Sequence, residues 1–320
     1  MNQNKPVIFW HIPKCAGTSL RTIIARDLMN RYGMITAPRT INVPPQAGGI
    51  DVDKNHIWNE YNKYGWISMK EYIDFDNLIT HPYTEDNFKW GFVHIVNNEL
   101  WKYWLYNVKD KSSNKCIEVH MNRAPSDNDM KVYDHTTSIV DDLCTNKIYK
   151  DFSWITMLRD PTERLISEYM FINKLDLHAS NLPMGSSHIY KFWGHLPSNM
   201  SIEDYANNPH TFNSQTKQLI GKGYLGEYEV TEKDVDSLID TMEQLDVKVG
   251  IKEMFIDSIK YYNTSLGFNI DTYNVPHIRK NGHKPEVSDR IRKIFKANNE
   301  LDYKLYDYYL DKLNSLKFYQ

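Results

Sequence analysis

The sequence predicts an α/β protein in which helices flank a parallel β-sheet. Short apolar runs typical of buried strands alternate along the chain with longer segments of helical periodicity, and this alternation is typical of parallel sheets. The chain has 320 residues, of which 41% are hydrophobic, so it is long enough for one large domain. We expect a single domain over 1–320, with an aromatic-rich inserted segment at about 38–130, where the pattern weakens.

The first predicted strand covers 6–12, and the helix after it covers about 18–31, because four aliphatic residues recur on one helical stripe. A short strand is predicted at 131–135, and a helix opened by a Thr cap at 136–146. The apolar run 152–158 predicts a buried strand. The following helix covers 160–175, with Pro161 in the first turn, where proline is tolerated.

The remaining elements continue the alternation of strand and helix. The segment 231–245 predicts a helix because a Thr cap opens it, and the apolar run 246–251 predicts another strand. Helical periodicity returns at 252–266. It returns again at 286–313, which predicts one or two closing helices.

Composition excludes several classes of partner. The formal net charge is only −3, so no global charge favours nucleic acid or a membrane surface, and an anion site has to be local. Cys15, Cys116 and Cys144 lack metal-type spacing and favour a reducing compartment over a disulfide framework. No basic and apolar leader precedes Lys5, and no apolar run is long enough to cross a bilayer. We expect a cytoplasmic protein without a membrane anchor.

The first predicted strand runs into a loop suited to an anion, in the stretch "FWHIPKCAGTSLRTII" at 9–24. Lys14 supplies a positive charge, and Thr18 and Ser19 supply hydroxyl donors. Backbone N–H groups near Gly17, at the start of the helix, can cradle an anion. The alternative is an ordinary capped turn with an exposed lysine. The order of glycine and lysine differs from the Walker A pattern, which disfavours an ATPase or kinase.

A second strand ends in the same kind of loop, in "WITMLRDPTERLISEYMF". Arg159 ends the strand, and Ser167 follows eight residues later on the next helix. Arginine is suited to bidentate phosphate binding, although a structural ion pair is the alternative. Because loops after parallel strands line one crevice, the two loops suggest two anionic groups of a single ligand. This favours a P-loop-like nucleotide crevice.

The ordered pair "HIPKCAGTSL" and "LRDPTERLISEY" resembles the signature of the PAPS-dependent sulfotransferase family, in the carbohydrate branch that includes heparan sulfate 2-O-sulfotransferases. PAPS is 3′-phosphoadenosine 5′-phosphosulfate, and PAP is its desulfated product. The resemblance implies that Arg159 and Ser167 bind the 3′-phosphate. It also implies a loop for the 5′-phosphosulfate, formed by Lys14, Cys15, Ala16, Gly17, Thr18 and Ser19.

Later segments resemble further landmarks of that family, namely 213–221, 247–259 and 298–313. The segment 277–289 resembles its basic loop near the cofactor. Arg279, Lys280 and Lys284 in this loop could surround the phosphates of the nucleotide, although a solvated basic turn is the alternative.

Sulfuryl transfer to an alcohol needs a base for the proton of the hydroxyl and a cation on the leaving oxygen. Lys14 suits the second role. His135 is our candidate base, because it ends a predicted strand 24 residues before Arg159, close to the position of a Gly-His pair in the relatives. Here the pair reads Asp134-His135, and a structural histidine is the alternative. His11 is expected to support the first loop. The reserve candidates for the base are His81, His94 and His120.

The sequence therefore predicts a transferase that moves the sulfuryl group of PAPS to a hydroxyl of a carbohydrate or related acceptor and releases PAP. Aromatic residues within 56–106 could present ring faces to that acceptor, although rings in a core are the alternative. No metal is expected, because a sulfuryl group carries less charge than a phosphoryl group. Two alternatives remain open: a P-loop kinase-like phosphoryl transferase, and a non-catalytic PAP-binding module.

Overall fold

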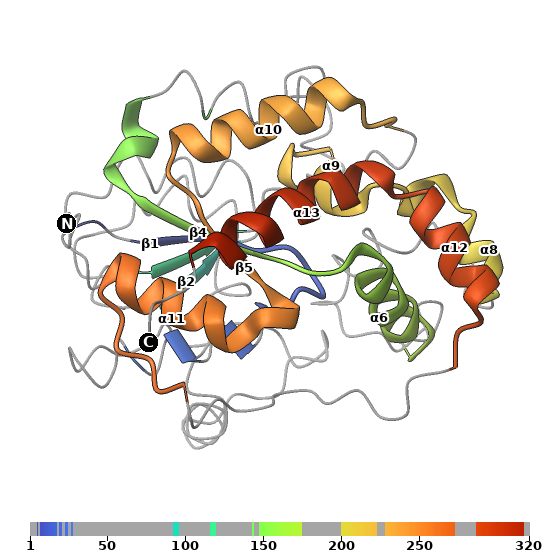
Figure 1. Cartoon of the computed structure of the whole chain (residues 1–320), viewed down its shortest axis with the longest axis horizontal. Coiled ribbons are helices and arrows are strands. Elements are labelled where there is room, and N and C mark those ends of the chain that lie inside the picture. The colour runs from blue at the N-terminus through green and yellow to red at the C-terminus, as the bar shows by residue number, and fades with distance from the viewer. Residues whose placement is uncertain are drawn as a thin grey trace, which may run out of the picture.

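A parallel β-sheet lies at the centre of the fold (Figure 1). It has five strands in the order β2-β3-β1-β4-β5. The strands are β1 (Val7–Trp10), β2 (Phe92–Ile95), β3 (Cys116–Val119), β4 (Ser153–Leu158) and β5 (Lys248–Ile251). The computed structural model describes residues 5, 7–17, 19–20, 23–24, 27, 92–95, 116–119, 143, 147–174, 200–222, 228–272 and 286–316. Every strand pairing is parallel, so the loops that follow the strands leave from one edge of the sheet.

The central strand β1 is fully buried, and its side chains alternate between the two faces of the sheet. Ile8 and Trp10 belong to one core cluster, and Val7 and Phe9 belong to another. Strand β4 alternates in the same way across the same two clusters. A strand that is buried on both faces reads as a continuous apolar run, as the sequence of β1 does.

Helices cover both faces of the sheet, with α11 on one side and α10 and α13 on the other (Figure 1). The helix after β1 joins the α11 side through Leu20, Ile23 and Ile24. A third core cluster packs α6, α8 and α12 together at one end of the molecule. The helices are α6 (Pro161–Lys174), α8 (Ile202–Ala206), α9 (Ser214–Leu219), α10 (Glu232–Gln244), α11 (Phe255–Leu266), α12 (Asp289–Ala297) and α13 (Glu300–Ser315). The 3₁₀ turns are η4 (Lys147–Asp151), η6 (Pro209–Thr211) and η7 (Lys252–Met254).

The structure confirms the predicted α/β fold with a parallel sheet flanked by helices. The predicted strands at 6–12, 152–158 and 246–251 correspond to β1, β4 and β5. Thr231 caps α10 in a reciprocal capping box with Asp234, as a Thr cap at that position predicts. The predicted closing segment is two helices, α12 and α13.

Two strands were not predicted. Both β2 and β3 lie within 38–130, the range in which we expected an inserted segment, and they form one edge of the sheet. The predicted strand at 131–135 lies outside the described residues. The predicted helix at 136–146 is described only at Leu143, which is helical and buried.

Candidate active site

The loop after β1 has an unusual backbone. Lys14 and Ala16 both have positive φ angles, 70° and 63°, although neither residue is glycine. Left-handed backbone costs about 1–3 kcal/mol at a residue with a Cβ atom, so the surrounding structure has to hold it in place. Left-handed residues at alternate positions turn successive N–H groups toward a common side and form an anion-binding nest. The loop therefore has the backbone form of an anion site.

A helix begins directly after this nest. Gly17 is its first helical residue, and the N–H of Leu20 donates to the carbonyl of Ala16 at 3.0 Å. A helix N-terminus carries a partial positive charge and unpaired N–H donors, which adds to the anion affinity of the nest.

Gly17 is required for space. A Cβ atom at this position would lie 1.8 Å from Nε2 of His11, whose ring lies against the loop backbone. The His11 ring also stacks on Phe9 with a centroid distance of 5.1 Å. These contacts give His11 a supporting position under the loop.

The structure brings the first and second loops together through Arg159. This residue follows β4 and is only 6% exposed, and its Nη1 donates to the carbonyl of Lys14 at 3.0 Å. The Lys14 side chain lies over the ring of Phe171 on α6, with Nζ 4.0 Å from the centroid. Two cationic side chains from loops 145 residues apart thus share one edge of the sheet.

Arg159 keeps donor capacity for an anion. Its nearest carboxylates are those of Glu163 at 4.0 Å and Glu253 at 3.9 Å, which exceed ordinary hydrogen-bond lengths. Its Nε atom has no hydrogen-bond partner among the residues that the structure describes. A phosphate could accept from this buried guanidinium.

Ser167 lies on α6 and is also buried, with 6% of its surface exposed. No side-chain hydrogen bond within the described part of the chain joins it to Arg159. The structure therefore places Ser167 on the helix that Arg159 precedes.

Arg164 is a residue of the site that the sequence analysis missed. Its guanidinium is completely buried, and its Nε donates to the carbonyl of Pro13 at 3.1 Å. Its Nη1 donates to Ser214 at 2.6 Å and pairs with Glu168 at 2.8 Å. Burial alone would lower the pKa of Arg164, but the Glu168 carboxylate raises the pKa above its ordinary value. Arg164 is thus a permanent cation that stabilises the first loop by donating to the carbonyl of Pro13.

Gln215 and Asp302 were also missed. Gln215, on α9, contacts both Cys15 in the first loop and Arg159 in the second. Asp302, on α13, accepts from the backbone N–H groups of Gln215 at 2.9 Å and Thr216 at 2.7 Å. All three polar residues, Arg164, Gln215 and Asp302, lie far along the chain from the loop that they support. Each of them lies in a segment that resembles the family, namely "LRDPTERLISEY", 298–313 or 213–221, and this resemblance was the only sequence signal for their place in the site.

Cys15 is a structural thiol. It is buried in the first loop, and burial raises its pKa to about 12 despite the nearby Arg164 and Arg159. At neutral pH it is therefore an uncharged thiol, able to donate a hydrogen bond but a weak nucleophile.

Five predicted site residues lie outside the described residues, namely Thr18, His135, Arg279, Lys280 and Lys284. Of the reserve histidines, His94 lies in β2, and the other two are not described. Among the described residues there is no group of His, Cys, Asp and Glu side chains that could hold a metal ion. No helix in the described ranges is long and apolar enough to cross a membrane.

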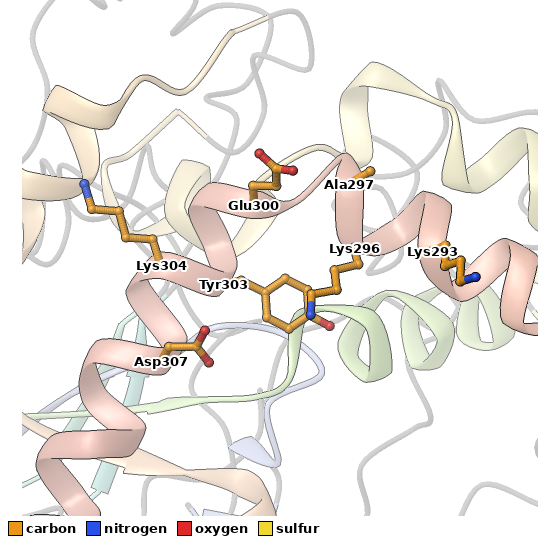
Figure 2. Close-up of a pocket in the computed structure, with 7 residues that line it drawn as sticks. All are labelled: Lys293, Lys296, Ala297, Glu300, Tyr303, Lys304 and Asp307. Carbon is orange, nitrogen blue, oxygen red and sulfur yellow. The ribbon is translucent and has the colours of Figure 1, made fainter.

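A surface pocket lies between α12 and α13 (Figure 2). Its lining carries charges of both signs and consists of Lys293, Lys296, Ala297, Glu300, Tyr303, Lys304 and Asp307. Tyr303 connects it to the second loop, because its hydroxyl lies 2.8 Å from Oγ1 of Thr162 and 3.2 Å from Oδ2 of Asp160. None of the predicted site residues that the structure describes lines this pocket.

A sequence model described as the sulfotransferase family matches residues 1–309 of the chain. The protein belongs to the sulfotransferase family. No curated protein matches the chain significantly. As a sulfotransferase, it is a transferase whose family reaction is sulfuryl transfer to an acceptor, which argues against the phosphoryl-transferase alternative.

Proposed function

We propose that this sulfotransferase moves the sulfuryl group of PAPS to a hydroxyl of a carbohydrate or a related acceptor and releases PAP. One observation carries the donor part of the proposal: Arg159 donates to the carbonyl of Lys14, beside a backbone nest at a helix N-terminus. A cation for one phosphate and a nest for another therefore lie side by side. A nucleotide with two separate anionic groups, such as PAPS, fits this arrangement.

Within this proposal the first loop, from Lys14 to Ser19, holds the 5′-phosphosulfate. Arg159 and Ser167 hold the 3′-phosphate, and the unpartnered Nε of Arg159 supplies a donor for it. Arg279, Lys280 and Lys284 add positive charge around the nucleotide.

The chemistry needs one cation and one base. His135 takes the proton from the acceptor hydroxyl as the acceptor oxygen forms its bond to sulfur. The bond between sulfur and the oxygen of the 5′-phosphate breaks, and Lys14 neutralises the charge that develops on that oxygen. The acceptor leaves as a sulfate ester, and PAP is the other product.

The proposal is tested by incubating the protein with sulfur-labelled PAPS and a panel of hydroxyl acceptors, with polysaccharides, oligosaccharides and phenols as separate classes. We expect label in a carbohydrate class, with one PAP formed for each sulfate transferred. PAP binding without transfer to any acceptor would instead identify a non-catalytic PAP-binding module. Tight binding of ATP with Mg²⁺ but not of PAP would support a phosphoryl transferase.

His135→Ala tests the proposed base. The variant should bind PAP normally and lose sulfuryl transfer by about 10²–10⁴-fold. The wild-type rate should fall at acid pH, because only the neutral imidazole can accept a proton. Near-normal turnover would move the role to His81, His94, His120 or a carboxylate. Loss of PAP binding together with activity would make His135 a structural residue.

A further inference from the structure

The side chain of Gln215 bridges the two anion loops. Its Oε1 accepts from the backbone N–H of Arg159 at 3.1 Å, and its Nε2 donates to the carbonyl of Arg159 at 2.8 Å. The same Oε1 accepts from the Cys15 thiol at 3.3 Å. One amide thus satisfies both backbone groups of Arg159 and reaches the middle of the first loop.

Gln215 is itself held firmly. It is 1% exposed, and its own backbone N–H donates to the Asp302 carboxylate at 2.9 Å. Asn213, the N-cap of α9, accepts from the N–H groups of Leu301 and Asp302, each at 3.1 Å. Helices α9 and α13 therefore cap each other, which fixes the base of the Gln215 side chain.

The bridge differs in kind from the contact between Arg159 and Lys14. That contact uses the guanidinium, the group that would also donate to a bound phosphate. The bonds from Gln215 use only the backbone of Arg159, so they persist when the guanidinium changes partner. They are suited to keep the end of β4 in place while Arg159 engages a ligand.

We propose that Gln215 is a positioning residue that fixes the spacing of the two anion loops and so determines recognition of a nucleotide carrying both a 5′ and a 3′ phosphate. The inference rests on the proposed function. Because two linked groups bind cooperatively only when their sites are correctly spaced, loosening the bridge should affect bisphosphates more than monophosphates.

The test is calorimetry of Gln215→Met with PAP, 5′-AMP and 3′-AMP. Methionine keeps the length and burial of the side chain but removes all three hydrogen bonds. We expect PAP affinity to fall about 10-fold or more, and the affinity for each monophosphate to fall less than about 3-fold. The readout is the loss of PAP affinity divided by the loss of affinity for each monophosphate. A general loss of folded protein would lower the affinity for all three ligands equally.

Two further variants support the comparison. Gln215→Glu keeps an acceptor for the N–H of Arg159 but puts an oxygen against its carbonyl. It should therefore also lower the affinity for PAP more than the affinity for the monophosphates, and it serves as the test if the methionine variant fails to fold. Gln218→Met makes the same substitution at another buried glutamine of α9. This control should lower the stability of the fold without changing the ratio of the affinity for PAP to the affinity for each monophosphate.

Unchanged PAP affinity in a folded Gln215 variant would overturn the inference and leave the proposed function standing. An equal loss of affinity for all three nucleotides would also overturn it, since a purely structural role of Gln215 would give that result. If the wild-type protein binds none of the nucleotides, the proposed function fails, and the inference fails with it.

Discussion

At the scale of single residues, Lys14 combines a left-handed backbone with a side chain directed toward Phe171. Its carbonyl and its ammonium group therefore serve different purposes. The carbonyl fixes Arg159, whereas the ammonium group is the cation that the proposed chemistry requires at the leaving oxygen.

Replacing this side chain should separate turnover from binding. Lys14→Ala leaves another residue with a Cβ atom at the left-handed position, so the backbone strain stays nearly the same. We expect turnover to fall about 10²–10³-fold, the usual loss for a removed transition-state donor, with a smaller change in PAP affinity. Steady-state kinetics and calorimetry measure the two effects. Lys260→Ala, at a half-exposed lysine of α11, is the control, and unchanged turnover in folded Lys14→Ala would contradict the assignment.

Arg159 should determine the preference for the 3′-phosphate. In Arg159→Ala the preference for PAP over 5′-AMP should largely collapse, because a buried charge-assisted contact is lost. Calorimetry with both nucleotides checks this. Arg290→Ala on α12 removes an exposed arginine that pairs with Glu203, and it should leave the preference intact. A full preference in folded Arg159→Ala would show that the 3′-phosphate binds elsewhere.

The residues that could be predicted from the sequence are those next to a strand end, such as Lys14 and Arg159. Both follow an apolar run, and a strand end followed by a helix start has a local signal. Arg164, Gln215 and Asp302 could not be predicted as parts of the site from local pattern. Their roles come from contacts across the fold, and a polar residue on a helix is ordinarily exposed.

At the scale of elements, helix α9 is too short to be stable alone, and it is held by its neighbours. It has six residues, and Asp302 satisfies two N–H groups of its first turn. Asn213 does the same for the first turn of α13. This mutual capping lets a short helix present Gln215 rigidly.

Helix α9 also carries a buried lysine that should make stability depend on pH. Lys217 donates from Nζ to the carbonyl of Pro209 at 2.9 Å, and burial lowers its pKa to about 8. The unfolded chain keeps this proton up to about pH 10.4, so above pH 8 the unfolded state binds more protons than the folded state. The contribution of Lys217 to the free energy of unfolding should therefore rise with pH.

Urea unfolding of the wild type and Lys217→Met isolates this effect from other titrating groups. The wild type should gain about 1 kcal/mol relative to the variant between pH 8 and pH 9. A difference that is constant or shrinks over this interval would mean that Lys217 is not destabilised as a cation in the folded protein.

At the scale of the whole molecule, the sheet places β1 between β3 and β4, so its loop lies in the middle of the edge where ligands bind to parallel sheets. The parallel architecture could be predicted from the alternation of strands and helices. Strands β2 and β3 could not, because a polar side chain, His94 or Glu118, interrupts each four-residue run at its third position. Such short runs lack a readable period.

Because the site joins segments from the whole chain, nucleotide binding should stabilise the fold as a unit. At a PAP concentration about 100 times its Kd, the free energy of unfolding should increase by about 2.7 kcal/mol. For a protein of this size the midpoint of thermal unfolding should rise by about 4 °C. Thermal scans with PAP, and with 5′-AMP at the same concentration, measure this. The smaller shift should be that of 5′-AMP, and absence of any shift with PAP would contradict the assigned site.

The dependence of the first loop on distant residues has a consequence for how the protein assembles. Residues 13–17 come early in the chain, yet Pro13, Lys14 and Cys15 are fixed by side chains at positions 159, 164 and 215. Position 215 is in turn fixed by Asp302. The earliest-made part of the site can take its final shape only after almost the entire sequence has been synthesised. A nascent chain that already contains β1 and its loop therefore cannot yet bind the nucleotide. Binding of the sulfuryl donor has to wait until folding is complete.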